Sequence, residues 1–328
     1  MDMIRTVGLA SSIMEATPET SFIESLCLPI VREAQNADGG WGFHVGSQSR
    51  VEPTCWALQA LMDSSCPEDP QGVDRGFQFL RATQLADGSW PFSSEGKVGC
   101  WVTSLACWVL LREKDSSNAV AAGLNWLCKD WPRDSSLWVR VLKRFSTQQL
   151  VCPINNSYRG WGWTARTSSW VEPTSLAALV LDECPKQLLP PSASRRRQLA
   201  ESMLYDRMCP GGGWNCGNPL VYGVAGEPLV VPTSWALLAL RNHPQRAENV
   251  ASLDWLEKSI RAVRSGASLA LAKICLETYG REFPVNGPGL DEIYSRNEFL
   301  GNVQTAAWTC LAFSKRERWL VNADRKTC

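Results

Sequence analysis

The stretch Asp38-Gly39-Gly40-Trp41, followed from Val51 by VEPTCWALQAL, contains the two features that decide the fold: a glycine–tryptophan turn and a short apolar helix. The turn recurs as Asp87-Gly88-Ser89-Trp90, Gly160-Trp161-Gly162-Trp163 and Gly211-Gly212-Gly213-Trp214. An apolar stretch follows each recurrence, reading VGCWVTSLACWVLL from Val98, VEPTSLAALVL from Val171 and VVPTSWALLAL from Val230. Two weaker copies without the turn are GASLALAKICL from Gly266 and VQTAAWTCLAF from Val303. This self-similarity predicts a repeat protein.

A more amphipathic stretch precedes each apolar one, at about residues 22–35, 73–84, 118–131, 194–208, 248–263 and 290–297. A helix that is apolar nearly all round is buried on both sides, whereas an amphipathic helix covers a core with one face. The alternation therefore predicts an all-α fold, an (α/α)6 toroid or barrel. In it, six apolar helices form the inner wall around an apolar central cavity, and six amphipathic helices form the outer wall.

The organisation along the chain follows from this repeat. We expect a single domain over residues 1–328, with repeats from about 22 to 315. Residues 132–158 do not fit the period and are interpreted as an insertion between the third outer and inner helices. The LLPPS segment at 188–192 is expected to link two repeats, because the repeat continues after it.

The charge balance and the cysteines narrow the choice of partner and compartment. Lysine plus arginine equals aspartate plus glutamate, 33 each, so nucleic acid is not expected as a partner. The run Arg195-Arg196-Arg197 is predicted to lie on a solvated helix face. The 13 cysteines form no CxxC pair and mostly lie in helical stretches, which indicates buried, reduced thiols. Without a transmembrane stretch or a secretion signal, a cytoplasmic location is expected, with peripheral membrane contact left open.

Two of the turns carry a resemblance to a known superfamily. The segments Ala34-Gln35-Asn36-Ala37-Asp38-Gly39-Gly40-Trp41 and Ala82-Thr83-Gln84-Leu85-Ala86-Asp87-Gly88-Ser89-Trp90 resemble the QW repeats of terpenoid cyclases and protein prenyltransferases. In that motif a glutamine that ends an outer helix and a tryptophan in the turn tie neighbouring helices together. The resemblance covers about residues 22–313 and implies an α/α barrel with an apolar cavity.

Metal-dependent activities of this superfamily are not expected here. Prenyltransferases hold zinc with an aspartate, a cysteine and a histidine, but this chain has only His44 and His243. Cys100 opens an apolar helix, yet Val98 stands two residues before it in place of an acid. The DDxxD magnesium motif of class I synthases is also absent. We therefore expect neither a metal site nor a cofactor.

Two glutamates are the candidate catalytic residues. Class II terpene cyclases use the middle aspartate of a DxDD motif, which is absent here, but aligning the threonines puts Glu52 at that position and Glu172 two repeats later. A carboxyl group at the rim of an apolar cavity has a raised pKa and can act as a general acid. Arg50 and Pro53 replace the flanking aspartates of the motif around Glu52. The alternative is a structural role, since the helix macrodipole stabilises a glutamate in the first turn.

Aromatic and polar residues supply the candidate substrate contacts. The tryptophans of the apolar helices can stabilise a carbocation or serve as packing anchors, and those concerned are Trp56, Trp101, Trp170, Trp235 and Trp308. The long polar loop at 214–227 contributes Asn218, Tyr222 and Glu227, which Arg166 can join in holding a polar head group. The alternative for this loop is a glycine-rich connector without a binding role.

The leading functional hypothesis is a terpene-cyclase-like enzyme, an isomerase or lyase of class II type. It would perform acid-initiated chemistry on an isoprenoid or other apolar small molecule in the central cavity. One alternative is a non-catalytic toroid that binds a lipid, a prenyl group or a protein. Another is a different enzyme on the same scaffold, with paired carboxylates as general acid and base.

Overall fold

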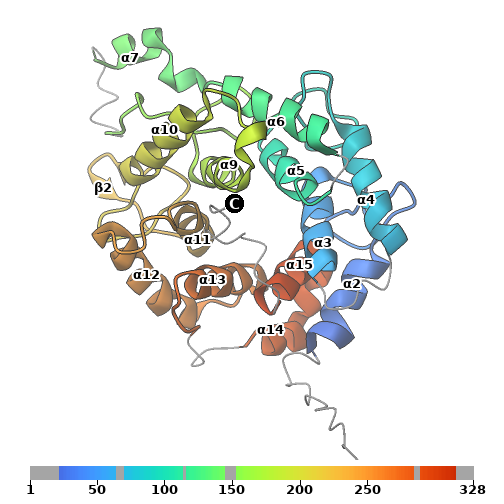
Figure 1. The fold of residues 1–328 in the computed structure, drawn as a ribbon. Coiled ribbons are helices and arrows are strands. Elements are labelled where there is room, and N and C mark those ends of the chain that lie inside the picture. Colours follow the sequence, from blue (N-terminus) through green and yellow to red (C-terminus); the bar gives the residue numbers. More distant parts are fainter. Residues whose placement is uncertain (1–21, 64–69, 114–115, 145–152, 284–288, 315–328) are drawn as a thin grey trace, which may run out of the picture.

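The computed structural model describes residues 22–63, 70–113, 116–144, 153–283 and 289–314. The inner helices are α3 (Val51–Asp63), α5 (Val102–Leu110), α9 (Val171–Glu183), α11 (Val230–Ala239), α13 (Gly266–Thr278) and α15 (Val303–Ala312). The outer elements are η1 (Ile23–Cys27) with α2 (Leu28–Glu33), α4 (Pro70–Thr83), α6 (Ser117–Lys129), α10 (Ala193–Asp206), α12 (Ala247–Ser259) and α14 (Leu290–Asn297). Figure 1 shows them as two concentric rings. The predicted all-helical toroid of six hairpins is confirmed.

The ring closes because the last inner helix, α15, packs against both α13 and α3. The loops that precede the inner helices are also joined around the ring by main-chain hydrogen bonds. The amide of Val51 donates to Phe92 O at 3.4 Å, and that of Val171 donates to Cys216 O at 3.1 Å. The amide of Val303 donates to Phe43 O at 2.8 Å and links the sixth repeat to the first. The inner helices therefore begin at a common end, which we call the mouth.

The four glycine–tryptophan turns share one hydrogen-bond pattern. In each, the tryptophan amide donates at 2.9 Å to a threonine Oγ1 on the following inner helix, through Thr54, Thr103, Thr174 and Thr233. Each indole Nε1 donates at 2.6 to 2.9 Å to a carbonyl of the preceding outer helix, namely of Val31, Leu80, Leu127 and Leu204. The turn thereby fixes the inner helix against its own outer helix.

Two glutamines extend these ties to the next repeat. Gln35 Nε2 donates to Gly39 O at 2.9 Å and to Gly72 O on α4 at 2.7 Å. Gln84 Nε2 makes the corresponding bonds to Gly88 O and to Ala119 O on α6, both at 2.9 Å. Because each amide joins its own turn to the following outer helix, neighbouring hairpins are held in register.

In the third repeat, Arg196 of α10 makes the tie that the glutamines make in the first two. It was predicted to lie on a solvated helix face, but it is buried. Arg196 is fully buried, and its guanidinium lies 3.9 Å from the ring centroid of Trp161 and 4.3 Å from that of Trp131. Its Nη2 donates to Asp130 O at 2.9 Å. The prediction was wrong for Arg196 because α10 turns this residue inward, and a guanidinium is weakly hydrated and stacks well on aromatic faces. Arg195 is exposed, as expected.

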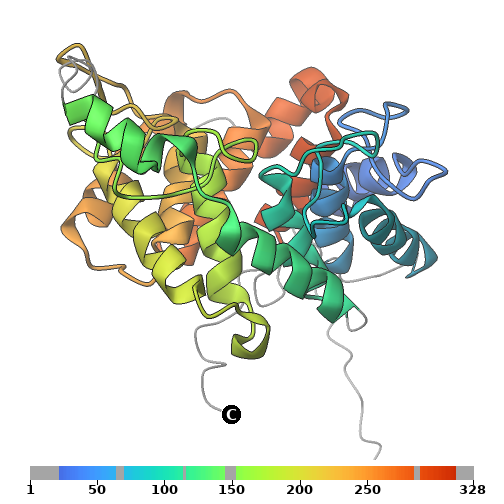
Figure 2. The ribbon, with the colours of Figure 1, turned by 90° about the horizontal axis from the view of Figure 1, so that it is seen from above.

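The segment between α6 and α9 contains a short turn, η3 (Arg133–Ser135), and an additional helix, α7 (Leu137–Arg144). Figures 1 and 2 show α7 outside the rings, beside the outer helix α10. The only strands among the described residues, β1 (Leu220–Val221) and β2 (Val224–Ala225), form an antiparallel hairpin in the loop before α11. Helix α7 and the β1–β2 hairpin therefore lie at the mouth, and the ring of inner helices continues past both.

Candidate functional site

Glu52 and Glu172 lie in the first turns of α3 and α9, at the mouth. Each is the second residue of its helix and is followed by a proline, which the first turn tolerates because the amides there have no partner within the helix. Both side chains are half-buried. Inner helices two positions apart in the ring thus present a carboxyl group at the same end.

The environment of both carboxyl groups favours their protonated forms. Burial raises the pKa of Glu172 from 4.5 to about 7. The pKa of Glu52 is also raised to about 7, chiefly by burial. The hydrogen bond that Gln304 Nε2 donates to Glu52 Oε1 at 3.0 Å lowers this pKa, and the negative charge of Glu172 raises it. Among the described residues, no cation contributes to either shift. Both carboxyl groups therefore gain or lose a proton close to neutral pH, and an ionised Glu172 favours the protonated form of Glu52.

Four tryptophans meet on the axis of the ring below these carboxyl groups. The ring centroid of Trp56 lies 5.6 Å from that of Trp235, 5.5 Å from Trp308 and 6.3 Å from Trp108. None of the four is more than 7% exposed. Trp56, Trp235 and Trp308, which are predicted substrate contacts, pack against one another because their inner helices α3, α11 and α15 face the same interior. We call this cluster of four rings the aromatic, or tryptophan, floor.

The floor and the acid are connected through helix geometry. Trp56 follows Glu52 by four residues on α3, and Trp308 follows Gln304 by four residues on α15. Residues four apart share one helix face. The Glu52–Gln304 hydrogen bond therefore lies one helical turn above the contact between Trp56 and Trp308.

A cavity of about 610 Å³ opens at the mouth beside α9. Its described lining includes three of the predicted contact residues, Arg166, Trp170 and Asn218. The other lining residues are Arg133, Val139, Ile154, Asn156, Thr167, Ser168, Ser169, Arg207 and Gly217. Several of these lie in the segment between α6 and α9, which has no counterpart in the other repeats, so the repeat pattern could not identify them.

The remaining predicted residues lie elsewhere at the mouth. Trp101 is the residue before α5, half-buried, and packs edge to face on Trp163 with ring centroids 5.2 Å apart. Tyr222 is at the tip of the β1–β2 hairpin, 76% exposed, with a φ of 51°. Glu227 is exposed after this hairpin. Neither Tyr222 nor Glu227 is among the residues lining the cavity.

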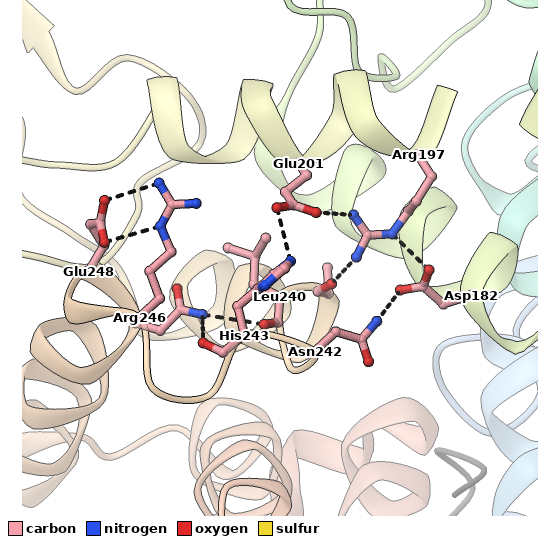
Figure 3. A network of polar contacts seen from close by, with 10 residues as sticks. Asp182, Arg197, Glu201, Leu240, Asn242, His243, Arg246 and Glu248 are labelled. Carbon is pink, nitrogen blue, oxygen red and sulfur yellow. Dashed lines mark hydrogen bonds and ion pairs between the residues drawn. The ribbon is translucent and has the colours of Figure 1, made fainter. Parts of the chain in front are cut away.

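The histidine considered as a zinc ligand belongs to a polar network instead. His243 Nε2 lies 3.0 Å from Glu201 Oε1, and Arg197 joins Glu201 to Asp182 (Figure 3). Asp182 is ten residues after Glu172 on α9, so this network lies about 15 Å from the candidate acids, towards the other end of the ring. No group of three metal-ligating side chains occurs in the part of the chain that the structure describes.

Comparison with known proteins identifies similar sequences. No family model matches the chain. Drimenyl diphosphate synthase from Streptomyces showdoensis is 25% identical over 256 residues, which cover 66% of this chain and 46% of that protein. Human lanosterol synthase is 37% identical over 67 residues, covering 17% of this chain and 9% of that enzyme. The chain is terpenoid cyclase-like. It spans about half the length of the first relative and a small part of the second.

Solved structures share the toroid. A single-residue variant of the type II terpene cyclase MstE from Scytonema, in complex with its product merosterolic acid A, aligns over 85% of this chain and 79% of its own, with a TM-score of 0.53 and 14% identity. The GH76A α-1,6-mannanase of Salegentibacter aligns over 88% of this chain and 96% of its own, with a TM-score of 0.54 and 10% identity. At these identities the likeness concerns the fold alone. None of the described helices is both long and apolar enough to span a bilayer.

Proposed function

We propose that the chain is a class II terpene-cyclase-like enzyme that starts a reaction by protonating an isoprenoid or other apolar substrate. The observation that carries this proposal is the pair Glu52 and Glu172, two electrostatically linked carboxyl groups with pKa values of about 7 above an aromatic floor. The similarity to drimenyl diphosphate synthase and to lanosterol synthase supports the same class of chemistry.

In this proposal Glu52 is the acid. Gln304 occupies one carboxyl oxygen of Glu52, so the other oxygen carries the proton. An ionised Glu172 raises the pKa of Glu52 and keeps that proton in place until the substrate arrives. A carbocation formed at this point would lie about one helical turn from the tryptophan floor, and indole rings stabilise nearby cations by cation–π attraction.

The pKa also constrains the substrate. A carboxyl group with a pKa near 7 is protonated in a large fraction of molecules at neutral pH, yet it is a weak acid. Such an acid is better matched to an acid-sensitive group, such as an epoxide oxygen, than to an isolated alkene. Class II cyclases that protonate an alkene use the acidity of the DxDD aspartates, which this chain lacks. We therefore expect an epoxidised or otherwise activated isoprenoid to react fastest.

The test is turnover of linear isoprenoids. The protein is incubated with squalene, its terminal epoxide, and prenyl diphosphates with and without a terminal epoxide, and products are analysed by mass spectrometry. We expect a cyclised product from the wild type and a loss of about 100-fold or more for Glu52→Gln. Glu282→Gln, which changes an exposed glutamate beyond the C-terminal end of α13 and away from the mouth, is the matched control. The absence of cyclised product from every substrate would contradict the proposal.

The same carboxyl pair supports a second candidate, general acid–base hydrolysis. Linked carboxyl groups serve as acid and base in many glycoside hydrolases, and the GH76A mannanase shares the toroid. Hydrolysis of aryl glycosides by the wild type, abolished by Glu52→Gln and by Glu172→Gln alike, would favour this candidate. Cyclised isoprenoid products without glycoside hydrolysis would exclude it.

We also propose peripheral contact with an anionic membrane through α7. Its sequence, LWVRVLKR, contains three basic residues and no acidic one. Four apolar side chains are between 45% and 76% exposed: Leu137, Trp138, Val141 and Leu142. A short helix that combines exposed tryptophan and leucine with basic residues suits the interface of a bilayer with acidic head groups. Since Val139 of this helix lines the cavity, an apolar substrate could enter from the lipid.

A further inference from the structure

The cavity beside α9 has a cationic wall. Three arginines from three separate elements line it: Arg133 in η3, Arg166 in the loop before α9, and Arg207 after α10. None of its described lining residues is acidic. The remaining polar lining residues carry hydroxyl or amide groups, which donate hydrogen bonds readily. This composition differs from the tryptophan floor and favours a negatively charged ligand.

The arginines are held in place by neighbouring groups. Arg207 is 2% exposed, and its Nη1 donates to Gly217 O at 3.4 Å while its Nε lies 3.2 Å from Asp206 Oδ2. The backbone of Arg166 has a φ of 59°, a conformation that costs energy for a residue with a side chain. Its amide donates to Asp130 Oδ1 at 3.1 Å. Buried or constrained positions of this kind preorganise a binding site.

The charge of the nearby carboxylates does not cancel that of the arginines. Asp206 pairs with Arg207, and Asp130 lies beside both Arg196 and Arg166. Among the side chains that the structure describes, these two carboxylates neighbour Arg166, Arg196 and Arg207, and Arg133 adds a further positive charge at the cavity. The wall keeps a positive excess, and guanidinium groups bind diphosphate and carboxylate oxygens in bidentate geometry.

We propose that this cavity binds the anionic head group, a diphosphate or a carboxylate, of an amphiphilic substrate. The inference rests on the proposed function, since it places the apolar chain of that substrate towards the acids. Trp170 lines the cavity and comes two residues before Glu172. The cavity wall at Gly217 lies against Trp170 and Val171. A chain that leaves the head group along Trp170 therefore reaches the first turn of α9, where Glu172 lies.

The test measures head-group binding separately from turnover. Isothermal titration calorimetry is carried out with inorganic pyrophosphate and with a short aliphatic carboxylate, on the wild type and on Arg133→Gln and Arg166→Gln. Both arginines are exposed, so the variants are expected to fold, which circular dichroism verifies. We expect saturable binding of one of the two anions and at least about tenfold weaker binding in each variant. Arg195→Gln, on the exposed face of α10, is the matched control and should bind like the wild type.

The two ligands identify the head group, and the catalytic variants separate this inference from the proposed function. Tighter binding of pyrophosphate indicates a diphosphate, and tighter binding of the carboxylate indicates an acid. Glu52→Gln should retain the wild-type affinity, so loss of turnover with intact binding concerns the acid alone. No saturable binding of either anion, or an equal loss in Arg195→Gln, overturns the assignment of the cavity even where cyclisation is observed.

Discussion

The raised pKa of Glu52 predicts that the protein loses stability as the pH rises, and that Glu52→Gln restores part of it. A carboxyl group whose pKa is higher in the folded state than in the unfolded state contributes stability below the unfolded value of 4.5. That contribution is lost as the pH passes through the folded value of about 7. The difference amounts to about 3 kcal/mol at most.

Glutamine is a neutral mimic of the protonated acid and can still accept the hydrogen bond from Gln304 Nε2. The variant should therefore match the wild type at pH 4.5, where both side chains are neutral. At pH 8 it should exceed the wild type by about 1–3 kcal/mol, with the lower end reflecting partial solvent access. Urea unfolding followed by tryptophan fluorescence at the two pH values measures both quantities.

The control is Glu227→Gln, which removes the same charge from an exposed position and should be neutral at both pH values. Glu172→Gln adds a second check, because loss of its negative charge should lower the pKa of Glu52 and move the fall in stability to lower pH. Equal stability of the wild type and Glu52→Gln at pH 8 would refute the reasoning, since the ionised carboxylate would then be no less stable in the fold than in water.

Three further predictions concern the ring and its mouth. Arg196→Leu should lower the free energy of unfolding by about 2–4 kcal/mol, because it removes two aromatic stacking contacts and buried hydrogen bonds; a change below about 0.5 kcal/mol in urea unfolding would contradict this. Gln84→Ala should cost about 1–2 kcal/mol through the loss of two hydrogen bonds, measured in the same way. The double substitution Trp138→Ser with Leu142→Ser should weaken cosedimentation with phosphatidylglycerol vesicles. Leu300→Ser, which changes a similarly exposed side chain outside α7, should not weaken it. Equal effects of the two variants would exclude α7 as the membrane contact.

The ring could be predicted from the sequence because its cause is local and repeated. Each glycine–tryptophan turn is followed by a threonine whose Oγ1 accepts a hydrogen bond from the tryptophan backbone amide, so one pattern in the sequence corresponds to one set of contacts. Helical periodicity then separates inner from outer helices. The position of Glu52 and Glu172 at the mouth follows from the same repeat, since both stand two residues before such a threonine.

The contents of the ring depend on contacts between distant residues and could not be predicted in the same way. Gln304 meets Glu52 across 252 positions of sequence, and no repeat pattern relates the two. Arg133 in η3 and Arg207 after α10 line the same cavity although they are far apart in the sequence, and no repeat pattern relates them. The direction of Arg196 depended on where α10 begins, and a shift of one residue would have turned it outward.

The tryptophan cluster limits the size of substrate that the proposed enzyme can accept. The four indoles contact one another across the ring, so a chain that enters at the mouth meets them about one helical turn below Glu52. The space at the mouth, about 610 Å³, is in the range of pockets that hold single small ligands. A farnesyl-sized chain with an anionic head group at the arginines fits this arrangement better than a folded squalene-sized chain. Cyclisation should therefore be faster for the shorter substrates, and Trp235→Ala, which removes one of the four rings, should shift this preference towards longer chains.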